Sequence, residues 1–165
     1  MYALRQWSVR HARGLNRFYR GFERLLLSMH GVFDAIGHER LERPVAALER
    51  TVKGLLFDCR MCGQCVLSDT GMSCPMNCPK TLRNGPCGGV RADGRCEVRP
   101  DMKCVWVEAH RGSRRIPGGI DAMSKVQFAV DHRLQGRSSW LRVVREKRPP
   151  AQAESAPVRA RPGTP

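Results

Sequence analysis

The sequence predicts a small cysteine-rich domain, dominated by loops and flanked by α-helices, with a disordered C-terminal tail. Eight cysteines fall within 46 residues of the 165-residue chain, and this region has no sustained apolar period of 2 or 3.6 residues. Two stretches before it have the apolar spacing of amphipathic helices. Aromatic residues make up only 6%, and 11 prolines and 16 glycines punctuate the chain. The apolar core is therefore modest, and we expect bound metal to fix the middle of the chain as a metal-cluster domain.

Residues 1–43 are predicted to be an amphipathic helical segment. Apolar side chains recur at helical spacing over residues 15–26, arginines occupy the other faces, and the helix is expected to end near Gly31. The first 22 residues carry five arginines and no acidic residue, a composition also typical of an organellar transit peptide. Because the apolar stripe continues past any cleavage point, a helix with a basic polar face is favoured.

Residues 44–110 are predicted to be the cysteine-rich metal-cluster domain. It begins with a second helix, in which Pro44 takes a first-turn position. The apolar side chains of this helix, at helical spacing, are Val45, Leu48, Val52, Leu55 and Leu56. The helix leads directly to Cys59, beyond which Asn-Gly, Gly-Gly and Asp-Gly steps indicate successive turns.

The C-terminal third is expected to hold little apolar structure. Residues 111–147 are predicted to form a basic linker followed by a short basic helix over residues 138–147. Residues 148–165 are rich in proline and alanine and have almost no large apolar side chain, so this tail is predicted to be disordered.

The net charge of +14 is concentrated near the C-terminus, with 12 basic and 4 acidic residues in 111–165. A basic surface suits nucleic acid, an acidic protein or a polyanionic substrate. Nucleic acid is disfavoured because aromatic residues are not interleaved with the basic ones in the cysteine region. No apolar run of 18 residues and no secretory signal are found in the sequence, which favours a cytoplasmic protein without membrane partners. In a reducing compartment, clustered cysteines indicate metal ligation over disulfides.

The cysteines are the candidate metal and cofactor ligands, and no catalytic residue is assigned. They are Cys59, Cys62, Cys65, Cys74, Cys78, Cys87, Cys96 and Cys104. The first three have the C-x2-C-x2-C spacing of bacterial ferredoxin loops, in which a more distant cysteine completes the ligand set. A zinc site commonly uses two C-x2-C pairs, and no second pair follows here. Eight thiolates match two 4Fe-4S clusters, while zinc, or one cluster plus zinc, stays open as the alternative; spacing does not decide which cysteines share a cluster.

Other residues of this region fit a negatively charged cofactor. Glycine N–H groups can donate to cluster sulfurs where the backbone passes close to the metal, and such donors raise the reduction potential. Six basic side chains would offset the negative charge of thiolate-bound clusters. They are Lys80, Arg83, Arg91, Arg95, Arg99 and Lys103. Each taken singly is more commonly an ordinary solvated charge.

The run CRMCGQCVLSDTGMSCPMNCPKTLRNGPCGG, followed by GRCEV and CVWVEA, resembles the methylenetetrahydrofolate reductase C-terminal domain family, which includes the MetV-type small iron-sulfur/zinc subunit. The resemblance covers residues 44–110, and all eight cysteines fall within the family's pattern. It implies an accessory subunit, not catalytic alone, that binds a flavoprotein methylenetetrahydrofolate reductase catalytic subunit in folate one-carbon metabolism. An electron-donor protein is a further expected partner.

Three functions are therefore weighed. The first is an iron-sulfur electron-transfer subunit that relays electrons to the flavin of the reductase. The second is a structural docking module of the same reductase, stabilised by zinc or a cluster and without a redox role. The third, the least favoured, is a nucleic-acid-binding metal-knuckle protein, supported only by the basic C-terminal region.

Overall fold

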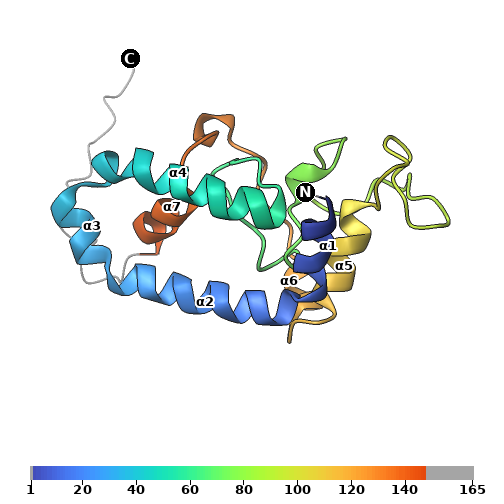
Figure 1. Ribbon diagram of the computed structural model, residues 1–165, viewed down its shortest axis with the longest axis horizontal. Coiled ribbons are helices and arrows are strands. Elements are labelled where there is room, and N and C mark those ends of the chain that lie inside the picture. Colours follow the sequence, from blue (N-terminus) through green and yellow to red (C-terminus); the bar gives the residue numbers. More distant parts are fainter. Residues whose placement is uncertain (1, 148–165) are drawn as a thin grey trace, which may run out of the picture.

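The computed structural model describes residues 2–147 and is mostly helical, without strands in that range (Figure 1). The elements are α1 (Tyr2–Arg10), α2 (Ala12–Ser28), α3 (His30–Ile36), α4 (His38–Phe57), the 3-10 turn η1 (Pro75–Asn77), α5 (Val105–Ser113), α6 (Gly119–Met123), the 3-10 turn η2 (His132–Leu134) and α7 (Ser139–Glu146). Between α4 and α5 the chain is loops and turns, with two isolated bridges, Val90 to Cys96 and Arg95 to Lys103. Helices around an irregular middle are thus confirmed; the predicted disordered tail, residues 148–165, lies outside the described residues.

Two long helices frame the molecule. The short α3 joins α2 to α4 at one end, and α7 packs against both long helices (Figure 1). At the other end α1 lies against α4 and α5, and α6 packs on α5. The cysteine loops leave the C-terminal end of α4; the first of them lies among the helices, and the later ones project beyond α5 (Figure 1). In the described part of the chain no helix is long and apolar enough to cross a membrane.

Two predicted helix boundaries are wrong, for local reasons. The helix expected to end near Gly31 stops at Ser28, and Gly31 lies inside α3. The helix expected to start at Pro44 starts at His38, directly after Gly37, whose φ of 94° breaks the preceding helix. Pro44 is tolerated inside α4 although it has no N–H to donate to the preceding turn. The short helix before the tail is confirmed as α7, and its Ser138 hydroxyl accepts a capping bond from the Leu141 N–H at 3.3 Å.

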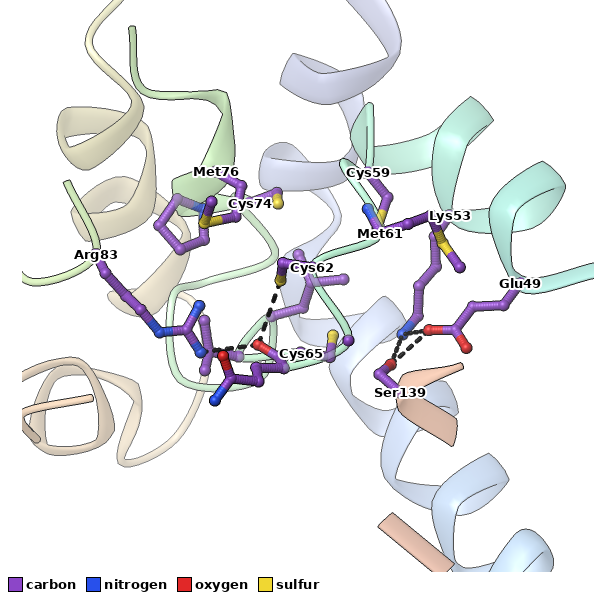
Figure 2. Close-up of a pocket in the computed structure, with 15 residues that line it drawn as sticks. Glu49, Lys53, Cys59, Met61, Cys62, Cys65, Cys74, Met76, Arg83 and Ser139 are labelled. Atoms are coloured by element: carbon purple, nitrogen blue, oxygen red, sulfur yellow. Dashed lines mark hydrogen bonds and ion pairs between the residues drawn. The ribbon is translucent and has the colours of Figure 1, made fainter. Parts of the chain in front are cut away.

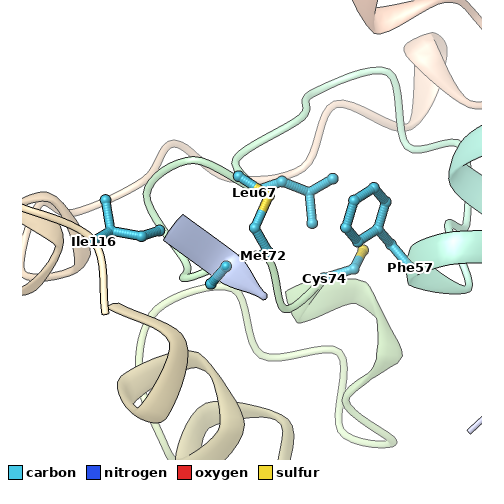
Figure 3. Close-up of a cluster of buried hydrophobic side chains, with 6 residues drawn as sticks. Phe57, Leu67, Met72, Cys74 and Ile116 are labelled. Carbon is cyan, nitrogen blue, oxygen red and sulfur yellow. The ribbon is translucent and has the colours of Figure 1, made fainter. Parts of the chain in front are cut away.

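The main apolar core reaches into the cysteine loops. Its buried members are Ala12, Phe57, Leu67, Met72, Cys74 and Ile116 (Figure 3). They come from α2, the end of α4, the loop that follows it and the turn after α5. One cysteine is therefore packed directly into the core, which fixes the loops relative to the helices.

Candidate metal-cluster site

Four cysteines line one small cavity at the end of α4: Cys59, Cys62, Cys65 and Cys74 (Figure 2). The first three come from the loop after Phe57, and Cys74 comes from the residue before η1. The cavity volume is about 20 Å³, which is room for about one water molecule. The three thiols of the C-x2-C-x2-C motif and one more distant thiol are thus brought together.

The backbone of this loop is held in conformations that favour glycine. Asp58 (φ 52°) and Met61 (φ 50°) are left-handed without being glycine, and Gly63 has φ 72°. A Cβ added to Gly63 would lie 2.6 Å from the carbonyl oxygen of Leu134, so the loop also packs tightly against η2. Such conformations cost about 1–3 kcal/mol each at non-glycine residues and concentrate at functional sites. Here they turn the chain so that successive cysteines face inward.

Burial dominates the chemistry of two of these thiols. It raises the pKa of Cys59 to about 11, opposed by a backbone hydrogen bond from the Met61 N–H to the Cys59 sulfur at 3.3 Å. Burial, and then the nearby Cys59, raise the pKa of Cys74 to about 12. These thiols therefore need a cationic group, such as a metal, to become thiolates at neutral pH.

Arg83 brings a buried positive charge to one side of the cavity. Its side chain is 8% exposed, and its Nη2 donates to the Gln64 carbonyl oxygen at 2.8 Å. Its Nε and Nη1 are buried without a hydrogen-bond partner. Leaving such donors unpaired costs about 1–3 kcal/mol or more each for a charged group. A negatively charged metal group held by the four cysteines would supply the missing acceptors, so the chemistry of the lining is compatible with metal binding, and the small cavity would have to widen around such a group.

A second buried cation lies on the opposite side of the four cysteines. Figure 2 shows Lys53 reaching the cavity from α4, with Glu49 and Ser139 beside it. Lys53 is 1% exposed and Glu49 is 2% exposed. Sequence reasoning missed both residues as parts of the site. Their i, i+4 spacing indicates pairing on a helix but carries no signal of burial.

The apolar spacing that predicts α4 does not mark its buried face. The buried side chains of α4 are Ala46, Glu49, Lys53 and Phe57. Leu48, Val52 and Leu55 are instead 59%, 40% and 54% exposed. The helix is correctly predicted, but these three residues of its apolar stripe face solvent because the charged pair is turned inward; Val45 and Leu56 are half-buried, and Leu56 packs against the main core.

The remaining four cysteines are spread over a neighbouring region. Cys78 packs beside the buried Cys96 in one small apolar cluster, and Cys104 is buried in the adjacent cluster at the start of α5. Cys87 is exposed, and its sulfur lies 3.9 Å from a carboxylate oxygen of Glu97. All eight cysteines are free thiols. Within residues 2–147, no three His, Cys, Asp or Glu side chains are grouped closely enough to hold a single metal ion.

A wide groove runs beside the four-cysteine cavity. Its volume is about 280 Å³, and it shares Cys65, Gly63 and Arg83 with the cavity wall. Phe128, which is 89% exposed, also lines it. One thiol of the cavity therefore faces an open depression of the surface.

The fold and the site define a small helical module whose loops carry eight free cysteines, four of them around one cavity. The family model described as methylene-tetrahydrofolate reductase C terminal matches residues 38–133, and the chain belongs to this family. The resemblance inferred from the sequence is thereby confirmed. No curated protein and no solved structure matches the chain. The matched range begins with α4 and ends within η2, so α1–α3 and α7 lie outside it.

Proposed function

We propose that the protein is a non-catalytic iron-sulfur subunit that binds a flavin-containing methylenetetrahydrofolate reductase and relays electrons to it. The observation that carries the proposal is the convergence of four cysteines on one cavity beside a buried arginine with two unpaired N–H groups. Family membership supports an association with a methylenetetrahydrofolate reductase. A 4Fe-4S cluster, when bound, supplies reversible one-electron transfer.

In this proposal Cys59, Cys62, Cys65 and Cys74 are the ligands of one cluster. The Met61 N–H donates to the Cys59 sulfur, the type of hydrogen bond that tunes iron-sulfur centres. Arg83 supplies further N–H donors from the side. The second cluster would be held by the four later cysteines: Cys78, Cys87, Cys96 and Cys104.

Electrons would pass between the protein and its partner at the groove. Cys65 lines both the cavity and the groove, so it would be the ligand through which electrons reach the surface. Val126 and Phe128, 86% and 89% exposed, stand on the segment that borders it. Exposed apolar side chains of this kind are typical of contact surfaces.

The exposed stripe of α4 is the proposed docking surface for the catalytic subunit. Leu48, Val52 and Leu55 lie on one helix face and directly precede the cysteine loop. A face of three large apolar residues on a family-matched helix gains stability when a partner covers it.

Anaerobic purification followed by iron, sulfide and zinc analysis tests the proposal. We expect a brown protein with broad absorbance near roughly 400 nm, about eight irons per chain, and bleaching on chemical reduction. A colourless protein with stoichiometric zinc would instead support the structural docking module. A pull-down of the flavoprotein reductase would be expected in both cases, so the redox response separates the two.

A further inference from the structure

Lys53 and Glu49 form a buried ion pair that borders the four-cysteine cavity. Both side chains lie on the inner face of α4, and Lys53 Nζ is 2.7 Å from Glu49 Oε1. Taking each of the two charges out of water costs several kcal/mol before the attraction between them is counted. Replacing such a pair by apolar residues of similar volume is often neutral or stabilising. The pair borders the four-cysteine cavity, which gives a reason to keep it there.

The hydrogen bonds of Lys53 are complete. An ammonium group has three N–H donors and no acceptor. Lys53 Nζ donates to Glu49 Oε1 at 2.7 Å, to Ser139 Oγ at 2.8 Å and to Tyr19 Oη at 3.2 Å. It also lies 5.3 Å from the centre of the Tyr19 ring and 5.2 Å from that of Trp140. Three helices, α2, α4 and α7, therefore hold this one charge in place.

The Glu49 carboxylate is also held in place by hydrogen bonds. Its Oε2 accepts a hydrogen bond from Ser138 Oγ at 2.7 Å and one from the Trp140 N–H at 3.3 Å. These donors belong to the N-terminal turn of α7, where an anionic side chain is favoured by the helix dipole. The carboxylate is thus compensated by α7, and Lys53 retains positive charge toward the cysteines.

Tyr19 is hydrogen-bonded to Lys53 and lines the same groove as Cys65. Because Lys53 can only donate, the Tyr19 oxygen accepts from it, and this bond fixes the ammonium in its place beside the cavity. Burial by itself lowers the pKa of Lys53, but Cys65, Tyr19 and Glu49 together raise it above its ordinary value. The ammonium is therefore charged at neutral pH.

We propose that Lys53, held in place by Tyr19, raises the reduction potential of the cluster ligated by Cys65. This inference rests on the proposed function. One electron arrives from a low-potential one-electron donor protein, which is oxidised by one electron, and no bond forms or breaks in the chain. The added negative charge is stabilised by the buried ammonium, which favours the reduced state. Lys53 is a positioning residue in this role because it lines the four-cysteine cavity without being a ligand, and Tyr19 supplies one of the three hydrogen bonds that hold its ammonium there.

Three variants of the full chain separate charge from packing. Lys53→Met keeps the length of the side chain and removes the positive charge. Glu49→Gln keeps a hydrogen-bonding group beside Lys53 and removes the negative charge. Tyr19→Phe keeps the ring over the Lys53 ammonium and removes only the hydroxyl. Lys125→Met, on an exposed lysine after α6, is the matched control for loss of one positive charge.

Midpoint potentials are measured by redox titration followed by electron paramagnetic resonance, together with iron per chain. We expect one of the two reduction waves to shift to lower potential in Lys53→Met and, by less, in Tyr19→Phe. The same wave shifts to higher potential in Glu49→Gln, and no wave moves in Lys125→Met. If Lys53→Met does not retain iron, the proposal is tested by the opposite shifts in midpoint potential that are expected for Tyr19→Phe and Glu49→Gln.

The outcomes distinguish this inference from the proposed function. A wild-type protein without iron-sulfur clusters overturns both. Clusters that form normally, but whose potentials stay unchanged or move in the same direction in Tyr19→Phe and Glu49→Gln, overturn the role of Lys53 alone. Equal shifts in the potentials of both reduction waves also overturn the role of Lys53, because a structural change spread through the protein would shift both potentials alike.

Discussion

Gly71 and Gly112 lie against each other with no room for a side chain on either. A Cβ added to Gly112 would be 2.0 Å from the Gly71 carbonyl oxygen, and one added to Gly71 would be 2.3 Å from the Ser113 nitrogen. This contact presses the loop before Met72 and Cys74 directly onto α5. The cysteine loops are therefore located by backbone packing as well as by the apolar core.

We expect Gly112→Ala to destabilise the protein by about 1–3 kcal/mol, because the added methyl must push two backbone segments apart. Thermal unfolding monitored by circular dichroism measures the change. Gly21→Ala is the matched control, since Gly21 lies within α2 and a Cβ there meets nothing within 4 Å. That control is expected to stabilise the protein by about 0.5–1 kcal/mol. Equal melting temperatures for the two variants would contradict the close contact.

The grouping of the cysteines predicts a pattern of iron loss. Cys62→Ser should remove about four irons per chain, and the double variant with Cys74→Ser should remove no more, because both residues belong to one proposed cluster. Combining Cys62→Ser with Cys96→Ser should remove about eight irons, because the two residues belong to different clusters. Iron and sulfide analysis after anaerobic purification measures both doubles. Similar losses in the two double variants would show that the cysteines are grouped in another way.

Arg83 predicts opposite effects on the metal-free and the metal-loaded protein. Arg83→Leu removes two buried N–H groups that lack hydrogen-bond partners, and it also removes one hydrogen bond to Gln64. Because unpaired buried groups destabilise the metal-free protein, the variant should melt at the same or a higher temperature in that form. The loaded protein should lose iron to a chelator several-fold faster, because the cluster loses a nearby cation. Arg91→Leu, on an exposed arginine, is the control and should change neither. A metal-free protein that is clearly destabilised, with unchanged iron loss, would assign Arg83 a purely structural role.

The exposed face of α4 predicts a separable effect on partner binding. Leu48→Asp places a charge on a side chain that is 59% exposed, so the melting temperature should stay nearly unchanged. The affinity for the flavoprotein reductase should fall tenfold or more, which corresponds to about 1.4 kcal/mol or more. Val98→Asp, at a 50% exposed apolar residue of the cysteine loops, is the matched control for calorimetric titration. Equal affinities for the two variants would place the docking surface elsewhere.

The parts of the fold that could be predicted from sequence are those set by local residue patterns. The short basic helix expected over residues 138–147 is α7, and the turn residues predict an irregular cysteine region. The start of α4 was missed because the break at Gly37 outweighs the preference of Pro44 for a first turn. The inward face of α4 depends on partners 34 and 86 residues away from Lys53, which no local period records.

The candidate site was predictable in its ligands and not in its surroundings. The C-x2-C-x2-C spacing identifies three cysteines, but only the fold brings Cys74 to the same cavity. Arg83 was one of six basic residues that looked alike in sequence, and burial without full pairing is what distinguishes it. The hydrogen bond to sulfur comes from Met61, whereas the sequence pointed to glycines.

Electron delivery from this protein to a flavin can be observed by anaerobic mixing of the two proteins. The protein is purified without oxygen, reduced, freed of reductant and mixed with the oxidised flavoprotein reductase, while absorbance follows cluster and flavin together. The flavin is expected to bleach as the cluster absorbance recovers, with one flavin reduced for every two electrons lost. A protein that binds the reductase tightly but leaves its flavin oxidised, or that carries only zinc, would rule out electron transfer as its function.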